Sequence, residues 1–183
     1  MKIKNIIESE KIIFKPLLKS DQPLLLKWLT NQTVLEFWEG KSAIFDLNRI
    51  KQDFYDKNNQ IIRTIIIYQG VPIGYCQMYI IDKQTAKEYD YKLNKKIVYG
   101  VDQFIGEPEF WGKGIGTNFM KLVVEYLFNH KGADAVILDP HTNNQRAIRC
   151  YQKVGFDVIK LLPQHELHDG EMVDCYLMEC KKN

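Results

Sequence analysis

Apolar positions along the chain follow two different periods, which predict alternating strands and helices. Short apolar runs bounded by polar residues or glycine are typical of buried strands, whereas apolar residues three or four positions apart are typical of amphipathic helices. The pattern predicts strands at residues 11–17, 61–68, 72–81, 97–105, 135–138, 156–162 and 172–180. It predicts helices at residues 21–30, 46–57 and 143–154, and another that begins at Ile115.

Polar segments between these elements predict turns and loops. Gln69-Gly70 separates two strand-like runs and predicts a hairpin turn. Residues 82–96 and the segment that joins the last two strands are polar and predict loops. Ser20 or Asp21 is placed to cap the first helix. No linker or repeat interrupts this order, so we expect residues 1–183 to form a single domain.

A glycine-rich segment, Trp-Gly-Lys-Gly-Ile-Gly-Thr at residues 111–117, joins a predicted strand to a predicted helix. Glycines at alternate positions leave backbone N–H groups uncovered, and the helix N-terminus adds further unpaired N–H groups. The segment therefore predicts a cradle for a phosphorylated cofactor, with an ordinary glycine-rich turn as the alternative. It is neither a dinucleotide fingerprint nor a P-loop, because its glycine spacing differs and Gly114 follows Lys113.

A second motif follows one predicted strand later, at residues 143–156, and reads Asn-Asn-Gln-Arg-Ala-Ile-Arg-Cys-Tyr-Gln-Lys-Val-Gly-Phe. The two motifs in this order resemble the GNAT superfamily of acetyl-coenzyme A-dependent N-acetyltransferases. The resemblance implies an α/β (α+β) GNAT fold, a mixed twisted sheet of about six to seven strands with helices on both faces. It also implies acetyl-CoA as cosubstrate and no metal. The GNAT loop usually begins with Gln or Arg, where this chain has Trp111.

Further segments resemble one GNAT family, the aminoglycoside 6'-N-acetyltransferases. They include residues 36–40, 71–75, 139–140 and 146–151, and residues 98–108 are similar to the acetyltransferase half of bifunctional acetyltransferase–phosphotransferases. The resemblance implies direct transfer of an acetyl group from acetyl-CoA to the 6'-amino group of an aminoglycoside, and hence antibiotic resistance. The alternatives are acetylation of a hydroxylysine-type siderophore precursor or a protein N-terminus, and a coenzyme A-binding regulatory module without turnover.

The catalytic predictions concern Asp102 and Tyr151. Asp102 lies late in an apolar strand, and the resemblance places it at the reacting amine as a base, as an anchor for the substrate ammonium, or as both; a structural role is the alternative. The resemblance makes Tyr151 the proton donor to the thioester sulfur, with a core tyrosine as the alternative. The predicted cofactor-binding residues are Phe104, Ile105, Gly112, Lys113, Gly114, Ile115, Gly116, Thr117, Asn144 and Tyr151.

Substrate recognition is expected to use carboxylates and aromatic rings, because an aminoglycoside is polycationic. Alternation puts Gln77 and Tyr79 on one strand face, although a cross-strand hydrogen bond would also explain Gln77. A simple turn is the alternative for Asp139, and Glu88 and Asp90 are left unassigned. The predicted substrate-binding residues are Trp38, Gln77, Tyr79, Tyr99, Asp102, Asp139 and Asp169.

Composition limits the other partners. The formal net charge is +2, and no run of basic residues forms a nucleic-acid patch. No apolar stretch approaches the ~20 residues that span a membrane, and we expect a cytoplasmic protein. We also expect a monomer or weak dimer. The four cysteines, Cys76, Cys150, Cys175 and Cys180, are expected to be free thiols. The segment His165-Glu166-Leu167-His168 lacks metal-motif spacing, so we expect its histidines to be on the surface.

Overall fold

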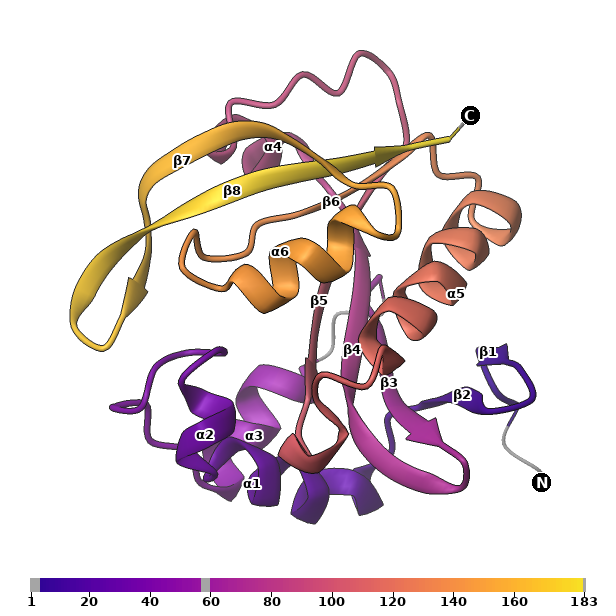
Figure 1. Ribbon diagram of the computed structural model, residues 1–183, viewed down its shortest axis with the longest axis vertical. Helices are drawn as coiled ribbons and strands as arrows, with labels where there is room; N and C mark the ends of the chain where they lie inside the picture. The colour runs from indigo at the N-terminus through magenta and orange to yellow at the C-terminus, as the bar shows by residue number, and fades with distance from the viewer. Residues whose placement is uncertain (1–3, 57–59, 183) are drawn as a thin grey trace. The chain divides into compact units, whose positions relative to one another are not determined.

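The computed structural model describes residues 4–56 and 60–182 (Figure 1). Contacts between residues divide the chain into two compact units. Unit 1 comprises the residues up to Gln77 together with Gln103–Trp111. Unit 2 comprises Met78–Asp102 together with the residues from Gly112 onward.

Unit 1 combines antiparallel strands with three helices. The strands β1, β2 and β3 pair antiparallel in sequence order, and α1 packs against α2 and α3. The end expected for the second helix, residue 57, lies outside the described residues, and the helix ends earlier, at Phe54. The bounds are β1 Ile7–Glu8, β2 Ile12–Pro16, η1 Lys19–Asp21, α1 Gln22–Leu29, α2 Gln32–Leu35, α3 Leu47–Phe54, β3 Ile62–Tyr68 and η2 Pro108–Phe110.

Two acidic residues precede the helices α1 and α3 but act differently. Asp46 caps α3, because its side chain accepts a hydrogen bond from the Arg49 backbone N–H at 2.8 Å. Asp21 occupies the N-cap position of α1 and makes no side-chain cap hydrogen bond. It accepts from the Leu18 N–H at 2.9 Å and pairs with Lys15 at 2.6 Å. The predicted capping by Ser20 or Asp21 is therefore wrong, since η1 engages that carboxylate.

The core of unit 1 is built around Phe104, whose ring contacts three other aromatic rings. Its centroid lies 4.9 Å from that of Trp38, 5.9 Å from Tyr75 and 6.0 Å from Trp28. Trp28 is fully buried, and its indole donates to Glu107 at 2.9 Å. Gly106 lies directly against the Trp28 ring, so that a Cβ atom there would overlap the indole. This half of the β5 strand is therefore fixed by tight aromatic packing.

Eight strands form the sheet in the order β1-β2-β3-β4-β5-β6-β8-β7. The strands β4 (Val71–Ile80) and β5 (Val98–Ile105) contribute residues to both units. The Gln69-Gly70 turn between β3 and β4 has positive φ at both residues, as a tight hairpin requires. The predicted mixed sheet is confirmed, and it has one strand more than expected because the short β1 adds to its edge.

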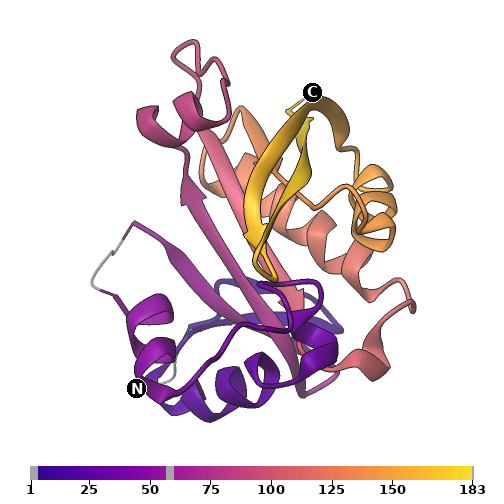
Figure 2. The same cartoon turned by 90° about the vertical axis from the view of Figure 1, so that its left-hand side faces the viewer.

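Unit 2 contains the rest of the sheet and three helices. Parallel pairing joins β5 to β6, and β8 pairs antiparallel with both β6 and β7. Figure 2 shows β7 and β8 as a long two-stranded ribbon, coloured orange to yellow. The bounds are α4 Lys83–Glu88, α5 Ile115–His130, β6 Ala135–Leu138, α6 Gln145–Gln152, β7 Asp157–His168 and β8 Glu171–Lys181.

Two segments of unit 2 predicted as loops are regular structure. Residues 82–96 contain α4, which Asp82 caps by accepting from the Thr85 N–H at 2.8 Å. The predicted loop before the last strand belongs to β7 and β8, and only Asp169 and Gly170, both with positive φ, form the turn. Polar residues hide α4 and β7 from a search for apolar runs, since each of these elements buries a single residue.

Two further features concern the cysteines and the helices. All four cysteines are free thiols. Among the described residues, no helix combines the length and apolar character needed to cross a bilayer.

Candidate active site

The glycine loop leads directly into α5 and leaves its first turn open. Gly112 and Gly114 have φ of 71° and 76°, values that residues with a side chain rarely adopt. A Cβ atom on either glycine would meet nothing within 4 Å. Gly114 is the N-cap of α5 and supplies no side-chain acceptor. The first N–H groups of this 16-residue helix therefore face the space beside the glycines without a side-chain cap. This arrangement fits an anionic group such as a pyrophosphate.

The next residues of the loop motif pack against α6. A Cβ on Gly116 would lie 3.4 Å from the Cys150 sulfur, and the Thr117 hydroxyl contacts the same sulfur at 3.5 Å. Ile115 is buried, with 3% exposed. The side-chain positions of these three residues thus face the protein, and only their backbone N–H groups are suited to bind a phosphate.

The second motif forms α6 and its cap. The Asn144 side-chain oxygen accepts from the Ala147 N–H at 3.2 Å, so the N-cap role weighed from the sequence is present. Tyr151 lies in the last turn of the helix with 8% of its surface exposed. Its ring centroid is 6.0 Å from that of Phe156. A core-tyrosine role and a proton-donor role are both compatible with this position.

Carboxylates and tyrosines gather in unit 2, in what we call the acidic cluster: Tyr79, Tyr89, Asp102, Asp139 and Glu166. Tyr79 donates to Asp102 at 3.1 Å, and Tyr89 donates to Asp139 at 2.9 Å. Burial, followed by the neighbouring carboxylates, raises the pKa of both phenols far above their ordinary value. Both tyrosines are therefore neutral hydrogen-bond donors at neutral pH.

Histidines extend the acidic cluster along the β7–β8 ribbon. His165 contacts Asp139 at 3.3 Å, and the hydrogen bond to that carboxylate raises the pKa of His165. His141, which follows β6, contacts Glu166 at 2.6 Å. The side chains of His165 and His168 are only 21% and 13% exposed. The expectation of surface histidines is therefore wrong, because β7 turns them toward the acids of unit 2.

Other predicted substrate residues of unit 2 are placed differently. Tyr99 is buried, and it is three positions from Asp102 in β5, so that alternation puts it on the opposite strand face. Asp169 lies at the β7–β8 turn with φ of 51° and a side chain 40% exposed. The structure brings Asp102, Asp139 and Tyr79 together and does not bring Tyr99 to them.

The predicted site residues of unit 1 lie among its aromatic rings. Trp38 packs on Phe104, and its buried indole nitrogen has no hydrogen-bond partner among the described residues. Gln77 accepts from the Tyr75 hydroxyl at 2.8 Å, a contact within one strand face rather than across strands. The Ile105 carbonyl accepts from the Trp111 indole at 2.9 Å. The Trp111 indole thus already binds one of the backbone carbonyls that the resemblance expects to pair with the pantetheine arm of the cofactor.

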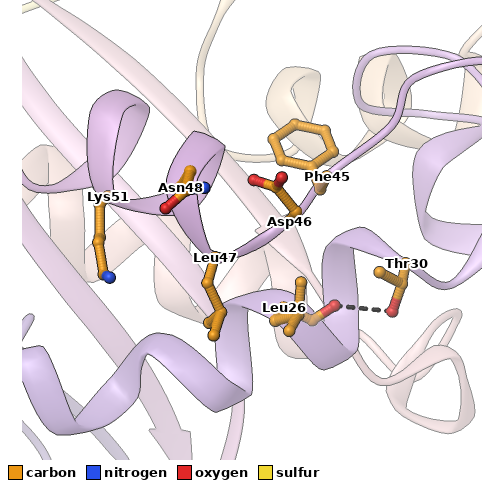
Figure 3. Close-up of a pocket in the computed structure, with 7 residues that line it drawn as sticks. All are labelled: Leu26, Thr30, Phe45, Asp46, Leu47, Asn48 and Lys51. Atoms are coloured by element: carbon orange, nitrogen blue, oxygen red, sulfur yellow. Dashed lines mark hydrogen bonds between the residues drawn. The ribbon is translucent and has the colours of Figure 1, made fainter.

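A separate hollow of about 670 Å³ lies on the surface of unit 1, between α1 and α3 (Figure 3). Thr30, on its rim, donates from its hydroxyl to the Leu26 carbonyl at 2.7 Å. None of the predicted site residues lines this hollow, which is formed by Leu26, Thr30, Phe45, Asp46, Leu47, Asn48 and Lys51.

Three members or neighbours of the acidic cluster were missed from the sequence: Tyr89, His165 and Glu166. Tyr89 meets Asp139 across 50 residues of chain, and no short-range spacing indicates such a pair. The one available signal was the density of histidine and acidic residues at 165–171.

Comparison with known proteins identifies the family. The family described as acetyltransferase (GNAT) domain matches residues 18–163. An aminoglycoside N(6')-acetyltransferase type 1 of Klebsiella pneumoniae is 30% identical over 156 residues, which cover 81% of this chain and 75% of the relative. The chain belongs to the GNAT acetyltransferases. The predicted superfamily is thereby confirmed, and the matched residues include both the glycine loop and α6.

Solved structures share the fold of this acetyltransferase. The structure of AAC(6')-Ib in complex with ribostamycin and coenzyme A matches with a TM-score of 0.75 at 24% identity, covering 94% of each chain. An uncharacterised Bacillus halodurans protein matches with a TM-score of 0.79 at 20% identity, covering 99% of this chain and 92% of the other.

Proposed function

We propose that this acetyltransferase transfers the acetyl group of acetyl-CoA to the 6'-amino group of aminoglycoside antibiotics, with residues 1–183 acting as a single domain. The observation that carries the proposal is the acidic cluster of unit 2. Its three carboxylates, Asp102, Asp139 and Glu166, stand beside two neutral tyrosine donors. A polycationic sugar with many hydroxyls matches this mixture of charge and hydrogen-bonding groups, and the Klebsiella pneumoniae relative bears the corresponding name.

The glycine loop is the proposed holder of the cofactor pyrophosphate. Its fit rests on the open space at Gly112 and Gly114 and on the uncapped first turn of α5. Acetyl-CoA supplies an activated thioester when bound. Phosphate oxygens would accept from the N–H groups of Gly114, Ile115 and Gly116, and the positive end of the helix dipole would favour their charge. Lys113 and Thr117 belong to the same proposed site, as does Asn144 at the start of α6.

Asp102 and Tyr151 are the proposed reacting groups of the chain. Asp102 binds the substrate ammonium and accepts its proton, since only the neutral amine can attack a carbonyl carbon. The new C–N bond would form as the C–S bond breaks. Tyr151 would give its hydroxyl proton to the departing sulfur, and the second proton lost from the amine nitrogen would return to Tyr151, while the proton on Asp102 passes to solvent. Tyr79, by donating to Asp102 at 3.1 Å, holds that carboxylate in place. Direct attack is proposed because Cys175, the thiol that lies beside His141 and Glu166, is fully buried, and a buried thiol is a poor nucleophile.

The remaining predicted contacts rest on one structural observation and on the resemblance. Trp38 is proposed to touch the antibiotic, because its buried indole N–H lacks a partner among the described residues. Gln77, Tyr99 and Asp169 stay in the proposed substrate set on the resemblance. Phe104 and Ile105 stay in the proposed cofactor set, with the second lone pair of the Ile105 carbonyl open to a further donor.

Thiol release tests the proposal. The protein is mixed with acetyl-CoA and kanamycin, free coenzyme A is followed with a thiol reagent, and mass spectrometry with NMR locates the acetyl group. We expect one acetyl group on the 6'-nitrogen and no release with an aminoglycoside that carries a 6'-hydroxyl. Release with a hydroxylysine-type amine or a peptide N-terminus, and none with kanamycin, would contradict the proposed substrate.

Tyr151→Phe tests the proton donor within the same assay. We expect a loss of ~10²-fold in turnover with the melting temperature unchanged, because the ring is kept and only the acidic proton is removed. Wild-type turnover together with a lower melting temperature would identify Tyr151 as a core residue instead.

A further inference from the structure

Three metal-ligating atoms of different chemistry meet in unit 2. They are a ring nitrogen of His141, a carboxylate oxygen of Glu166 and the sulfur of Cys175, all within 4.8 Å of one another. His141 and Cys175 are paired by an isolated antiparallel bridge, so the backbone fixes the imidazole beside the thiol. Glu166 reaches the same point from β7. Glu166 follows His141 by 25 residues in the chain. Sheet pairing brings Cys175 beside His141.

The donor set matches the preferences of a borderline divalent cation. Zinc is bound by imidazole nitrogen, thiolate sulfur and carboxylate oxygen at about 2.0–2.3 Å, most often with four ligands in a tetrahedron. With bonds of this length in a tetrahedron, two donor atoms around the ion lie roughly 3.5 Å from each other. The present separations of up to 4.8 Å need only a small contraction. Calcium and magnesium are disfavoured, because they require oxygen ligands.

Burial and accessibility also suit a metal site. His141 is 9% exposed and Cys175 is fully buried, which keeps competing water away from two donors. The Glu166 side chain is 42% exposed and gives an ion a path of entry. At present Glu166 contacts His141 Nε2 at 2.6 Å, a position where a shared proton can be exchanged for a cation.

A neighbouring histidine provides an independent observation. The His168 ring packs edge-to-face on the His141 ring, with centroids 4.6 Å apart. Its Nδ1 atom is buried and has no hydrogen-bond partner within the described part of the chain. A buried nitrogen without a partner is costly, and this one belongs to a ring that packs on His141.

We propose that His141, Glu166 and Cys175 form a binding site for a zinc-type divalent cation, with water or His168 as the fourth ligand. On binding, the Cys175 S–H bond is replaced by a sulfur–metal bond, and the proton shared by His141 and Glu166 is displaced. Both protons go to solvent, and no oxidation state changes. The bound ion ties the β7–β8 ribbon to the segment after β6, and it shares Glu166 with the acidic cluster.

Cobalt(II) is the probe for this site, because a thiolate ligand gives it a charge-transfer absorption in the near ultraviolet. The purified full chain is treated with a chelator, dialysed and titrated with CoCl₂, and then with ZnCl₂ as competitor. We expect the absorption to appear with one equivalent of cobalt and to be removed by zinc. Zinc should also raise the melting temperature in a concentration-dependent way, since it binds the folded state.

Variants assign the ligands. Glu166→Gln removes the half-exposed donor and should lower metal affinity by at least the roughly 10–100-fold that loss of an outer ligand partner costs. Cys175→Ser should abolish the absorption. Cys180 lies on the same strand as Cys175 but is not one of the three proposed ligands, so Cys180→Ser should leave both the metal affinity and the absorption unchanged. Glu171→Gln provides the matched control for the acid.

Two outcomes would overturn the site. The first is a wild-type protein that shows no thiolate-to-cobalt absorption at saturating cobalt. The second is a Glu166→Gln protein, folded by circular dichroism, that binds zinc as the wild type does. The Glu166→Gln comparison decides the matter even if Cys175→Ser fails to fold. Neither readout uses an aminoglycoside, so the result is independent of the proposed acetyltransferase substrate.

Discussion

The two halves of β5 are built for different tasks. In unit 2, Asp102 accepts from Tyr79 and belongs to a cluster of acids and hydroxyls. In unit 1, two residues further on, Phe104 is enclosed by the rings of Trp28, Trp38 and Tyr75. Even positions 102 and 104 share one strand face, yet one carries charge and the other is 7% exposed and apolar. A change in the first half is therefore expected to alter chemistry, and a change in the second to alter stability.

Asp102→Asn should give the largest effect. The substitution keeps the size and hydrogen-bonding capacity of the side chain but removes its charge and its ability to accept a proton. We expect weaker aminoglycoside binding and a fall in turnover of ~10²–10⁴, the usual range for general acid–base catalysis. Higher pH should restore part of the turnover, because more of the amine is then already neutral. Steady-state kinetics between pH 6 and pH 10 measure both effects.

Asp157→Asn, an exposed acid at the start of β7, is the control for this charge change. Its kinetics should equal those of the wild type. If folded Asp102→Asn protein also kept wild-type turnover and affinity, Asp102 would be structural, and the contrast between the two halves of β5 would fail.

Gly106→Ala probes the apolar half just beyond the strand. The added Cβ would overlap the fully buried Trp28 indole, which cannot move without disturbing the core. We expect a loss of about 1–3 kcal/mol in the free energy of unfolding, typical of overpacking. Denaturant unfolding measures the loss. The same change in a Trp28→Phe background should cost less, because the smaller ring leaves room; additive effects would show that the two residues do not interact.

Gly114→Val tests the glycine loop against a position with the same backbone geometry. Gly114 and Gly132 have φ of 76° and 67°, and a Cβ on either would enter open space. Both Val variants should lose a similar amount of stability to backbone strain. Only Gly114→Val should weaken coenzyme A binding, by about tenfold or more, if one phosphate contact of roughly 1.4 kcal/mol is lost. Calorimetric titration compares the two; equal affinities would remove the cradle assignment.

Asp90→Asn should give the smallest effect. Asp90, which the resemblance left unassigned, pairs with Lys160 of β7. The hydrogen bond and charge of Lys160 lower the pKa of Asp90. A lowered pKa means that the pair stabilises the fold above the ordinary Asp pKa near ~3.9 and stops doing so as pH falls through the folded-state pKa. The melting-temperature difference from the wild type should therefore be small at pH 7 and vanish in acid. A difference that persists in acid would contradict the ion pair.

The sequence predicts elements well where apolar residues follow one period. The strand at Ala135–Leu138 was placed at its observed bounds, and the helix from Ile115 follows from residues such as Phe119 and Val123, both fully buried. It predicts poorly where polar residues cover an element. The helix α4 buries Ala86 alone, and residues 163–168 of β7 are mostly polar, so neither segment leaves an apolar signal.

The candidate site divides in the same way. The glycine loop and the Asn144 cap depend on neighbours in sequence and could be predicted from spacing. The Tyr89–Asp139 and His141–Glu166 pairs join residues that are 50 and 25 positions apart in the chain, and no local pattern contains that information. The alternation of side chains along a strand was enough to predict that Tyr99 and Asp102 lie on opposite faces of β5. The resemblance nevertheless placed both residues in the substrate set.

The three tryptophans of unit 1 give the protein a set of distinct magnetic resonance reporters. Each indole N–H has a different partner: the Glu107 carboxylate for Trp28, the Ile105 carbonyl for Trp111, and none among the described residues for Trp38. A charged acceptor, a neutral acceptor and no acceptor shift an indole proton by different amounts. Three resolved signals in one spectrum would thus follow antibiotic and cofactor separately, with the Trp38 signal reporting the first and the Trp111 signal the second.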